Sequence, residues 1–339
     1  MKNNGTKIKI SNKWIGNNYP TFVVAEAGIN HNGSLRVAKK MISKAKEVGV
    51  DAVKFQTFKA IDLASLDSKF FRIFKKVELD YADFGELSDY AKSEGIIFFS
   101  TPFSEEAVDV LSRLDVPAFK IASGDITHIP LIKYVASKKK PVILSTGMSE
   151  LNEIRTALQA IKSKGNNNIA IMHSVSAYPT PPLDANLRAI TTLQNSFRYP
   201  IGYSDNGGGI LVPIVAVALG AQIIEKHFTI DKKMHGPDHF FSADPNELSR
   251  LVKDIRQIEE MLGDGKKRCQ MSELENKVGA RRSIIASGSI KKGMQITNKM
   301  IAIKRPSRGI QPAHFNKVIG KVSRRNIKAN EPIKWSDIK

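Results

Sequence analysis

The segment PVILSTGMSELNEIRTALQAIKSKG (141–165) joins a short apolar run to an amphipathic stretch that ends in glycine. The run PVILSTGM (141–148) has the length and composition of a strand that is buried on both faces. The stretch after it repeats apolar residues at helical spacing, with Ser149 at the expected N-cap and Gly165 at the expected C-cap. This segment therefore predicts one strand followed by one helix.

The same unit occurs eight times between Pro20 and Leu262. The eight predicted strands are TFVVAEAG (21–28), DAVKFQTF (51–58), IIFFSTPF (96–103), PAFKIASG (117–124), PVILSTGM (141–148), NIAIMHSVS (168–176), YPIGYSD (199–205) and AQIIEKHF (221–228). Ser34, Ser104 and Asp184 are further expected N-caps, and Gly49, Gly95 and Gly220 further expected C-caps. Eight such units predict an α/β fold with a closed (β/α)8 TIM barrel, because the alternative, a doubly wound open sheet, seldom repeats the unit eight times.

The sequence changes character after Gly263, which indicates a second domain. We expect a TIM barrel over 1–265, a polar linker with a short helix over 266–282, and a small, mostly β domain over 283–339. A domain of that size is marginal for independent stability, so docking on another surface is plausible.

Composition narrows the class of protein. The 339 residues are 42% hydrophobic, enough for a core, and contain no apolar run that would span a membrane and no signal-peptide core. The single cysteine, Cys269, cannot form an internal disulfide, so we expect a cytoplasmic protein without a membrane partner. The formal net charge of +19 is spread over runs such as SKKKP and DGKKR. Without zinc-finger spacing or an RNP-like box it favours an anionic substrate over nucleic acid.

Polar residues collect at the predicted strand ends, where TIM barrels carry their active sites. These residues are Glu26, Lys54, Gln56, Thr101, Lys120, Ser123, Ser145, Ser174, Ser176, Tyr178, Ser204, Asp205, Asn206, Glu225 and His227. Lys54 and Lys120 interrupt apolar strands, where an unpaired lysine is costly, so they suggest an anionic ligand. Each hydroxyl alone could be structural, but together they suit a phosphate. Glu26 could equally be a partner of a lysine or a catalytic base.

Eight motifs in order resemble the N-acetylneuraminate (sialic acid) synthase family, including the legionaminate and pseudaminate synthases. They are EAGINHNG (26–33), VKFQTF (53–58), FFSTPF (98–103), FKIASGD (119–125), ILSTGM (143–148), YPTP (178–181), EKHFT (225–229) and GPDH (236–239). KKG (291–293), KRP (304–306) and GK (320–321) resemble that family's SAF, or antifreeze-like, domain. The resemblance covers essentially the whole chain.

The resemblance implies a transferase that forms a C–C bond between phosphoenolpyruvate and an open-chain N-acyl amino sugar and releases phosphate. It implies a divalent metal, Mn²⁺ or Mg²⁺, and a domain-swapped homodimer in which the small domain caps the partner's active site. The implied residues are Glu26 and Glu225 for catalysis; Lys54, Thr101, Lys120, Ser123, Ser145, Ser176 and Ser204 for phosphoenolpyruvate; Gln56, Asp125, Tyr178, Asp238 and Arg305 for the sugar; and His227 and Asn206 for the metal.

The chain departs from the family at several positions. Asn206 stands in SDN where relatives usually have SDH, and an amide oxygen suits harder cations better than imidazole does. Ser176 often corresponds to Asn, Asp125 to Glu, and the linker end carries Arg281 and Arg282 where relatives are apolar. These changes put the metal and the sugar in question more than the fold.

Two further histidines accompany His227 in IIEKHFTIDKKMHGPDH (223–239). We expect His239 to fix a loop through hydrogen bonds and His235 to face solvent. Other functions remain open: another barrel aldolase or a keto-deoxy sugar acid synthase that retains a phosphate, and a sugar-binding protein of polysaccharide assembly that has lost its metal. The sugar itself could be N-acetylmannosamine, or a diacetamido hexose of the legionaminic or pseudaminic series.

Overall fold

The computed structural model describes residues 7–339, which form two compact units. The first unit ends at Gly263 and the second comprises Asp264–Lys339. Within the described residues, no helix has the length and apolar character needed to cross a membrane.

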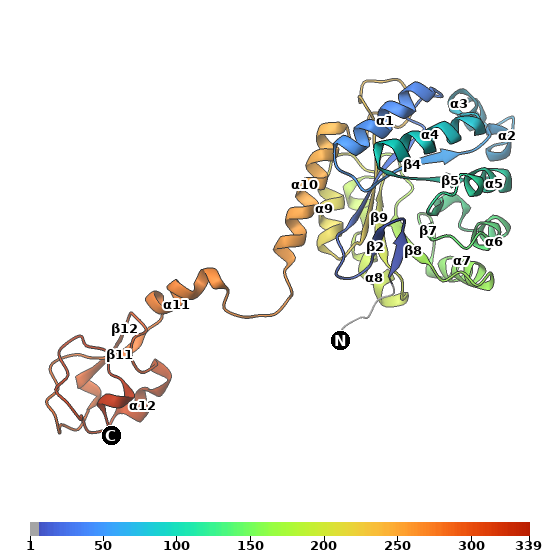
Figure 1. The fold of residues 1–339 in the computed structure, drawn as a ribbon. Coiled ribbons are helices and arrows are strands. Elements are labelled where there is room, and N and C mark those ends of the chain that lie inside the picture. Colours follow the sequence, from blue (N-terminus) through green and yellow to red (C-terminus); the bar gives the residue numbers. More distant parts are fainter. Residues whose placement is uncertain (1–6) are drawn as a thin grey trace. The chain divides into compact units, whose positions relative to one another are not determined.

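Eight parallel strands of the first unit close into a barrel, as the sequence predicted (Figure 1). The last strand pairs with the first, with His227 opposite Glu26. Nearly every strand residue is buried, which is why each strand reads as an apolar run. The strands are β3 (Phe22–Gly28), β4 (Ala52–Thr57), β5 (Ile97–Pro102), β6 (Phe119–Ile121), β7 (Val142–Ser145), β8 (Ile169–Ser174), β9 (Ile201–Asp205) and β10 (Ile223–His227).

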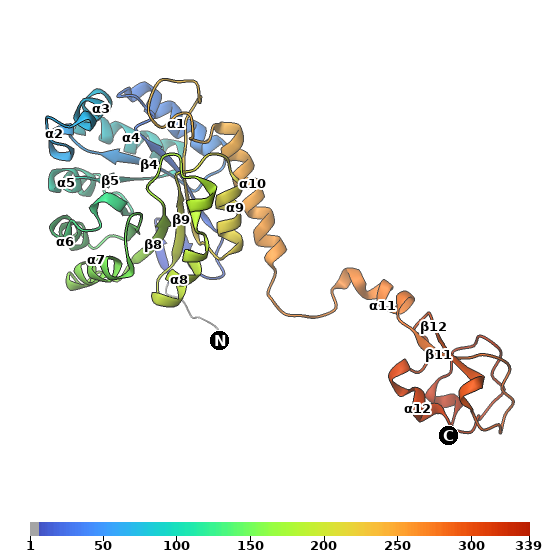
Figure 2. The ribbon, with the colours of Figure 1, turned by 180° about the vertical axis from the view of Figure 1, so that it is seen from behind.

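A ring of helices surrounds these strands, as the two opposite views show (Figures 1 and 2). The helices bury their apolar faces on the barrel and form one continuous core with it. They are α1 (Leu35–Glu47), α4 (Tyr81–Glu94), α5 (Glu105–Arg113), α6 (Ile129–Ser137), α7 (Leu151–Ser163), α8 (Arg188–Ser196), α9 (Leu211–Ala218) and α10 (Pro245–Leu262), with α2 (Ala60–Leu63) and α3 (Lys69–Val77) inserted after β4.

The structure confirms two of the four predicted N-caps, and the other two predictions are wrong. Ser34 and Ser104 accept hydrogen bonds from the first turns of α1 and α5. Glu150, rather than Ser149, is the N-cap of α7, and its N–H donates to Glu153. Asp184 lies inside a 3₁₀ turn, η2 (Pro182–Ala185), because the prolines before it break the helix; α8 starts only at Arg188.

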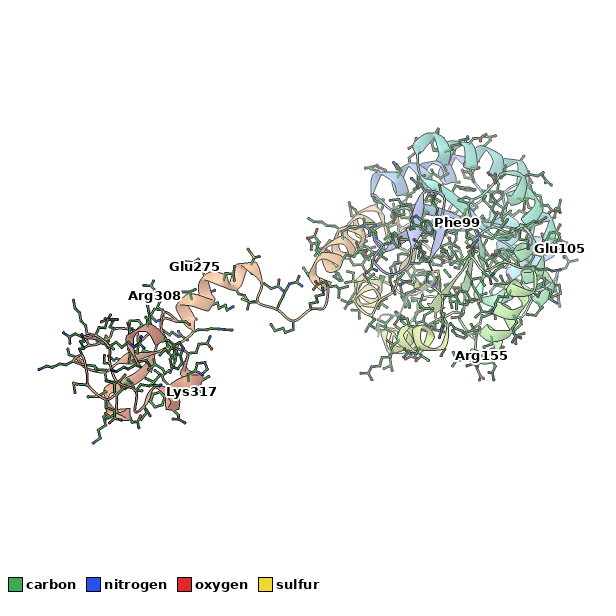
Figure 3. The ribbon with its side chains drawn as sticks, turned by 60° about the horizontal axis from the view of Figure 1, so that its bottom comes forward. Phe99, Glu105, Arg155, Glu275, Arg308 and Lys317 are labelled. Carbon is green, nitrogen blue, oxygen red and sulfur yellow. The ribbon has the colours of Figure 1, made fainter. Side chains whose placement is uncertain are left out.

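A hairpin closes the N-terminal end of the barrel. Its strands are β1 (Ile8–Ile10) and β2 (Lys13–Ile15). Ile8, Ile10 and Ile15 are fully buried against barrel residues that include Phe99, which Figure 3 labels within the first unit. The hairpin leaves the opposite end, at the strand C-termini, as the end available for chemistry.

The second unit has a small core of its own, mostly isoleucine. Arg325 pairs with both Asp337 and Glu331 at 2.7 Å and ties the end of the chain to this core. Its elements are α11 (Leu274–Ala280), β11 (Ser283–Ala286), β12 (Ile301–Lys304), α12 (Phe315–Val318) and the 3₁₀ turns η3 (Met271–Glu273), η4 (Asn298–Met300), η5 (Pro312–His314) and η6 (Trp335–Asp337). Isolated bridges such as Ile290 with Ile327 complete the unit.

Most of the chain's net positive charge lies in this second unit. Residues 264–339 contain 19 Lys and Arg against 5 Asp and Glu, whereas residues 1–263 contain 33 against 28. The basic runs in the sequence suggested an even spread of charge, but the net charge is concentrated in the second unit. Arg308 and Lys317, labelled in Figure 3, are two of the exposed basic side chains.

Candidate active site

The C-terminal strand ends surround a cavity of about 60 Å³. The family resemblance implied sixteen site residues, and twelve of them line this cavity. Each barrel strand, or the loop that follows it, contributes at least one of the twelve. They are Glu26, Lys54, Gln56, Thr101, Lys120, Ser123, Ser145, Tyr178, Ser204, Asn206, Glu225 and His227. Parallel strands bring these side chains together because all their C-terminal ends meet at one face.

Phe103, Ala122 and Ser174 also line the cavity and were not among the sixteen. Ser174 ends β8 and is one of the polar strand-end residues that the sequence indicates, but the family resemblance gave it no role. Phe103 and Ala122 are apolar, and nothing in the sequence distinguishes them from core residues.

Four of the sixteen residues lie outside the cavity wall. Asp238 is close to it, with its Oδ2 3.8 Å from His227 Nδ1. Ser176 is near Ser123, and both are close to Gly147. Asp125 lies in the 3₁₀ turn η1 (Ser123–Asp125), and Arg305 is exposed in the second unit, directly after β12.

Two lysines and two glutamates form a buried ion-pair network at the base of the cavity. Lys54 Nζ lies 2.8 Å from Glu26 Oε2 and 3.8 Å from Glu225 Oε1. Lys120 Nζ donates to both oxygens of Glu225, at 2.8 and 2.9 Å. All four side chains are at most 6% exposed, so removing one partner would leave an uncompensated buried charge.

The two glutamates have different electrostatic surroundings. Burial raises the pKa of Glu26 above its ordinary value, although Lys54 opposes the effect. Burial also acts to raise the pKa of Glu225, but Lys120 and Lys54 together hold it at about 2. The site therefore holds two carboxylates whose pKa values are shifted in opposite directions, the arrangement that separates acid–base roles in enzymes.

Hydroxyl groups also line the cavity. Thr101 Oγ1 accepts from Lys54 Nζ at 3.1 Å, and Ser204 Oγ donates to Glu225 at 2.9 Å. Ser123 Oγ accepts from the backbone N–H of Gly147 at 2.9 Å. Two ammonium groups beside several hydroxyls present the donors that a phosphate or carboxylate group requires.

His227 and Asn206 offer donor atoms for a metal. His227 is buried, and its Nδ1 has no hydrogen-bond partner. Asn206 donates through Nδ2 to Val175 O at 2.7 Å and to Ser174 Oγ at 3.2 Å, which leaves Oδ1 as its ligand atom. A free imidazole nitrogen and an amide oxygen on residues that line one cavity fit a divalent cation that takes its other ligands from substrate and water. Over residues 7–339, no three His, Cys, Asp or Glu side chains converge as a metal cluster.

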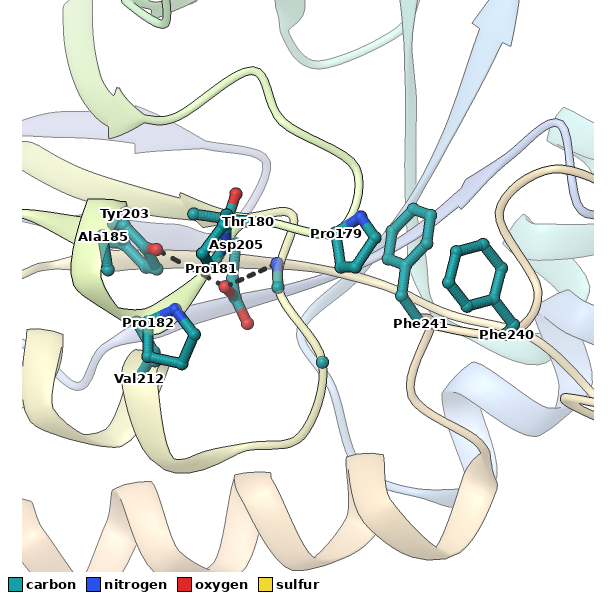
Figure 4. Close-up of a pocket in the computed structure, with 12 residues that line it drawn as sticks. Pro179, Thr180, Pro181, Pro182, Ala185, Tyr203, Asp205, Val212, Phe240 and Phe241 are labelled. Carbon is teal, nitrogen blue, oxygen red and sulfur yellow. Dashed lines mark hydrogen bonds between the residues drawn. The ribbon is translucent and has the colours of Figure 1, made fainter.

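Asp205, next to Asn206, is committed elsewhere. Its Oδ2 lies 2.6 Å from Lys226 Nζ, and its Oδ1 accepts from Tyr203 and from the N–H of Gly207 (Figure 4). Lys226 also donates to the carbonyl oxygen of Gly207. Lys226 and Asp205 are almost completely buried, so this ion pair is structural.

A second cavity of about 420 Å³ is lined in part by residues that adjoin those of the first in the sequence (Figure 4). Prolines 179, 181 and 182 line it together with Tyr203, Asp205 and Phe241. The ring of Phe241 packs 5.2 Å from His227 and 5.9 Å from Tyr178 between ring centroids. Phe241 therefore takes part in both the wall of this cavity and the aromatic contacts of His227.

The two other histidines behave as expected. His235 is exposed, whereas His239 is buried and contacts Thr229 Oγ1 at 2.7 Å and Asn32 Nδ2 at 3.2 Å. The structure thus confirms His239 as a residue that fixes a loop.

Comparison with known proteins gives two family matches along the chain. Residues 41–267 match the NeuB family and residues 281–339 match the SAF domain. The chain is 46% identical to uncharacterized protein MJ1065 of Methanocaldococcus jannaschii, over 98% of both chains. It is 42% identical to N,N'-diacetyllegionaminic acid synthase of Legionella pneumophila, over 95% of this chain and 96% of the relative.

A solved structure supports the same relationship. The crystal structure of N-acetylneuraminic acid (sialic acid) synthetase from Leptospira borgpetersenii matches with a TM-score of 0.77 and 39% identity. The match covers 80% of this chain and 95% of that chain.

Proposed function

Because the chain belongs to the NeuB family, whose characterised relatives are sialic-type acid synthases, we propose that it condenses phosphoenolpyruvate with an open-chain N-acyl amino sugar. Carbon 3 of phosphoenolpyruvate forms a bond to the aldehyde carbon of the sugar. Water adds to carbon 2, and phosphate leaves. The observation that carries this proposal is the pair of buried lysines, Lys54 and Lys120, beside the hydroxyls of the cavity.

In this proposal the base of the cavity holds phosphoenolpyruvate. Lys54 and Lys120 neutralise its phosphate and carboxylate groups. The hydroxyls of Thr101, Ser123, Ser145 and Ser176 donate to the remaining anionic oxygens. The Ser204 hydroxyl joins them by turning its proton from Glu225 to the ligand. Glu26 and Glu225 hold the two ammonium groups in place before the ligand binds, so the lysines do not have to rearrange on binding.

The two glutamates take separate roles. Glu26, with its raised pKa, transfers a proton to or from the reacting water and orients it. Gln56 Nε2 donates to Glu26 Oε1 at 3.0 Å and keeps that oxygen directed within the cavity. Glu225 stays ionised and keeps Lys120 charged and in place.

Synthases of this family are generally metal-dependent, and His227 with Asn206 would hold the metal here. When bound, Mn²⁺ or Mg²⁺ supplies a Lewis acid for the sugar aldehyde. Gly28 leaves room beside these groups: a Cβ on it would lie 3.6–3.7 Å from Glu26, Gln56 and His227.

The sugar contacts come from two copies of the chain in this proposal. Gln56, Tyr178, Asp125 and Asp238 belong to the barrel that binds the sugar, and Arg305 comes from the partner of a domain-swapped homodimer. The 42% identity to a diacetyllegionaminic acid synthase puts a diacetamido hexose first among the candidate sugars.

Charge supports the docking of the small domain on a barrel mouth. The loops after β5 to β8 and the first helical turns behind them carry six carboxylates and one arginine, Arg188. The six are Glu105, Glu106, Asp125, Glu150, Glu153 and Asp184. A domain with 19 basic and 5 acidic residues is electrostatically complementary to such a rim.

Phosphate release tests the proposal. The purified chain is incubated with phosphoenolpyruvate, Mn²⁺ or Mg²⁺, and either N-acetylmannosamine or a diacetamido hexose of the legionaminic or pseudaminic series. We expect release with one sugar and none without sugar. A product that retains a phosphate would point to a keto-deoxy sugar acid synthase. A folded protein that stays silent with every sugar and gains no thermal stability from Mn²⁺ would contradict the proposal.

A further inference from the structure

The loop between β10 and α10 carries groups that face His227. Asp238 lies 3.8 Å from the His227 ring, and the Phe241 ring packs against it. The loop leaves and rejoins the barrel at one point, where Thr229 N–H donates to Ala243 O at 2.9 Å. Between these residues, the position of 230–242 depends on contacts outside the barrel ladder.

Asparagines of the neighbouring loop, between β3 and α1, supply those contacts. Asn30, 1% exposed, donates through Nδ2 to Phe228 O at 2.8 Å and to Ser242 Oγ at 2.9 Å. Ser242 Oγ in turn donates to Asp238 O at 2.6 Å. Asn30 thus reaches the backbone of Asp238 through a single buried hydroxyl.

A second chain of contacts runs parallel to the first. Asn32 Nδ2 donates to His235 O at 2.9 Å and contacts His239 Nε2 at 3.2 Å. Thr229 Oγ1 donates to Asp231 O at 3.1 Å and therefore accepts from His239 Nδ1 at 2.7 Å. These roles leave His239 Nε2 as an acceptor for Asn32, so all the hydrogen bonds are mutually consistent.

We propose that Asn30, Asn32, Thr229, His239 and Ser242 form a clasp that positions Asp238 and Phe241 for the amino sugar. They are positioning residues, since none of them lines the cavity. This inference rests on the proposed function, because it assigns the clasp to the sugar and not to phosphoenolpyruvate. The loop between β3 and α1 thereby positions the residues that contact the amino sugar, although those residues follow β10.

Thr229→Val tests the clasp, because it removes the hydroxyl while keeping the shape of a fully buried side chain. Thr57→Val is the matched control: Thr57 is equally buried and its Oγ1 makes a contact of the same 2.7 Å, to Ser100, away from the cavity. Thr229→Ser restores the hydroxyl. The first readout is amide hydrogen exchange of peptides covering 230–242 in the full chain. We expect it to quicken about tenfold in Thr229→Val and to remain as in the wild type in the other two variants.

The second readout is the pair of KM values, measured with whichever amino sugar releases phosphate. Thr229→Val is expected to raise the KM for the sugar about tenfold and to leave that for phosphoenolpyruvate unchanged, with recovery in Thr229→Ser. Unchanged exchange in 230–242, or an equal rise in both KM values, would overturn the clasp. If the wild type releases no phosphate with any sugar, the proposed function fails, while the exchange readout still supports or overturns the clasp.

Discussion

One added methyl group at Gly147 would fill space between two serines of the site. A Cβ there would overlap Ser176 Oγ and lie 2.9 Å from Ser123 Oγ. We predict that Gly147→Ala raises the KM for phosphoenolpyruvate about tenfold or more, because both hydroxyls must move. Gly124→Ala is the control, since its Cβ would meet nothing within 4 Å. A KM within twofold of the control would remove these serines from the phosphoenolpyruvate site.

Asn206 stands in the proposed metal site, where the resemblance leads us to expect histidine. We predict that Asn206→His shifts metal preference toward Mn²⁺ over Mg²⁺, because imidazole is the softer ligand. Without metal, the unfolding free energy of this variant should be about 1 kcal/mol lower than that of the wild type. The reason is that an imidazole cannot replace both amide hydrogen bonds, to Val175 and Ser174. Melting temperatures across titrations with each metal measure both effects, with exposed Asn316→His as control. Titration curves that match the wild type would show that residue 206 is not a ligand.

At the scale of elements, the Lys226–Asp205 pair joins the ends of β10 and β9. Lys226 is 0% exposed, so Lys226→Met leaves the Asp205 carboxylate buried without its cation. We predict a loss of about 3–5 kcal/mol in the unfolding free energy of the barrel. The double variant with Asp205→Asn should recover much of it, because no unpaired charge remains. Urea unfolding measures the cycle, and a single variant within 1 kcal/mol of the wild type would refute the structural role.

The eight strand–helix units could be predicted because parallel strands buried on both faces read as apolar runs. The β1–β2 hairpin could not, because KIKISNKW is too short to indicate a strand pair until the barrel end that it covers is known. The two failed N-caps show the same limit: Glu153 and the prolines before Asp184 decide those helix starts by local geometry.

The cavity residues could be predicted because strand ends converge on one face. The outward direction of Asp205 also follows from strand alternation, since its neighbour Ser204 points inward to Glu225. Residues on loops were less predictable. Asp125, Ser176 and Asp238 lie on loops outside the cavity wall. The Asp238 backbone is held by Ser242, which Asn30 contacts from far away in the sequence, and no local pattern encodes such a contact.

At the scale of the whole molecule, mixing two inactive variants tests domain swapping. Under the proposed function, His227→Ala should inactivate a barrel and Arg305→Ala should inactivate a cap. In a swapped heterodimer one site combines the intact barrel of one chain with the intact cap of the other, so we predict that refolding the two together restores activity. Without swapping every site keeps one defect, and activity that stays absent in the mixture would contradict the exchange of caps.

The charge distribution makes a related prediction about salt. Because the small domain carries 19 basic and 5 acidic residues, the docking that we propose for it on the acidic rim of a partner should weaken as salt screens the attraction. Sedimentation at increasing NaCl should show dimers giving way to monomers. A dimer population that does not change with salt would mean that apolar contacts, and not charge, hold the copies together.

The central claim is that this chain joins carbon 3 of phosphoenolpyruvate to an amino sugar. Carbon-13 NMR tests it directly, with phosphoenolpyruvate labelled at carbon 3, the diacetamido hexose and Mn²⁺. We predict that the label moves into a methylene group of a nonulosonic acid while one phosphate is released for each product formed. Label recovered in the methyl group of pyruvate, with the sugar unchanged, would contradict it.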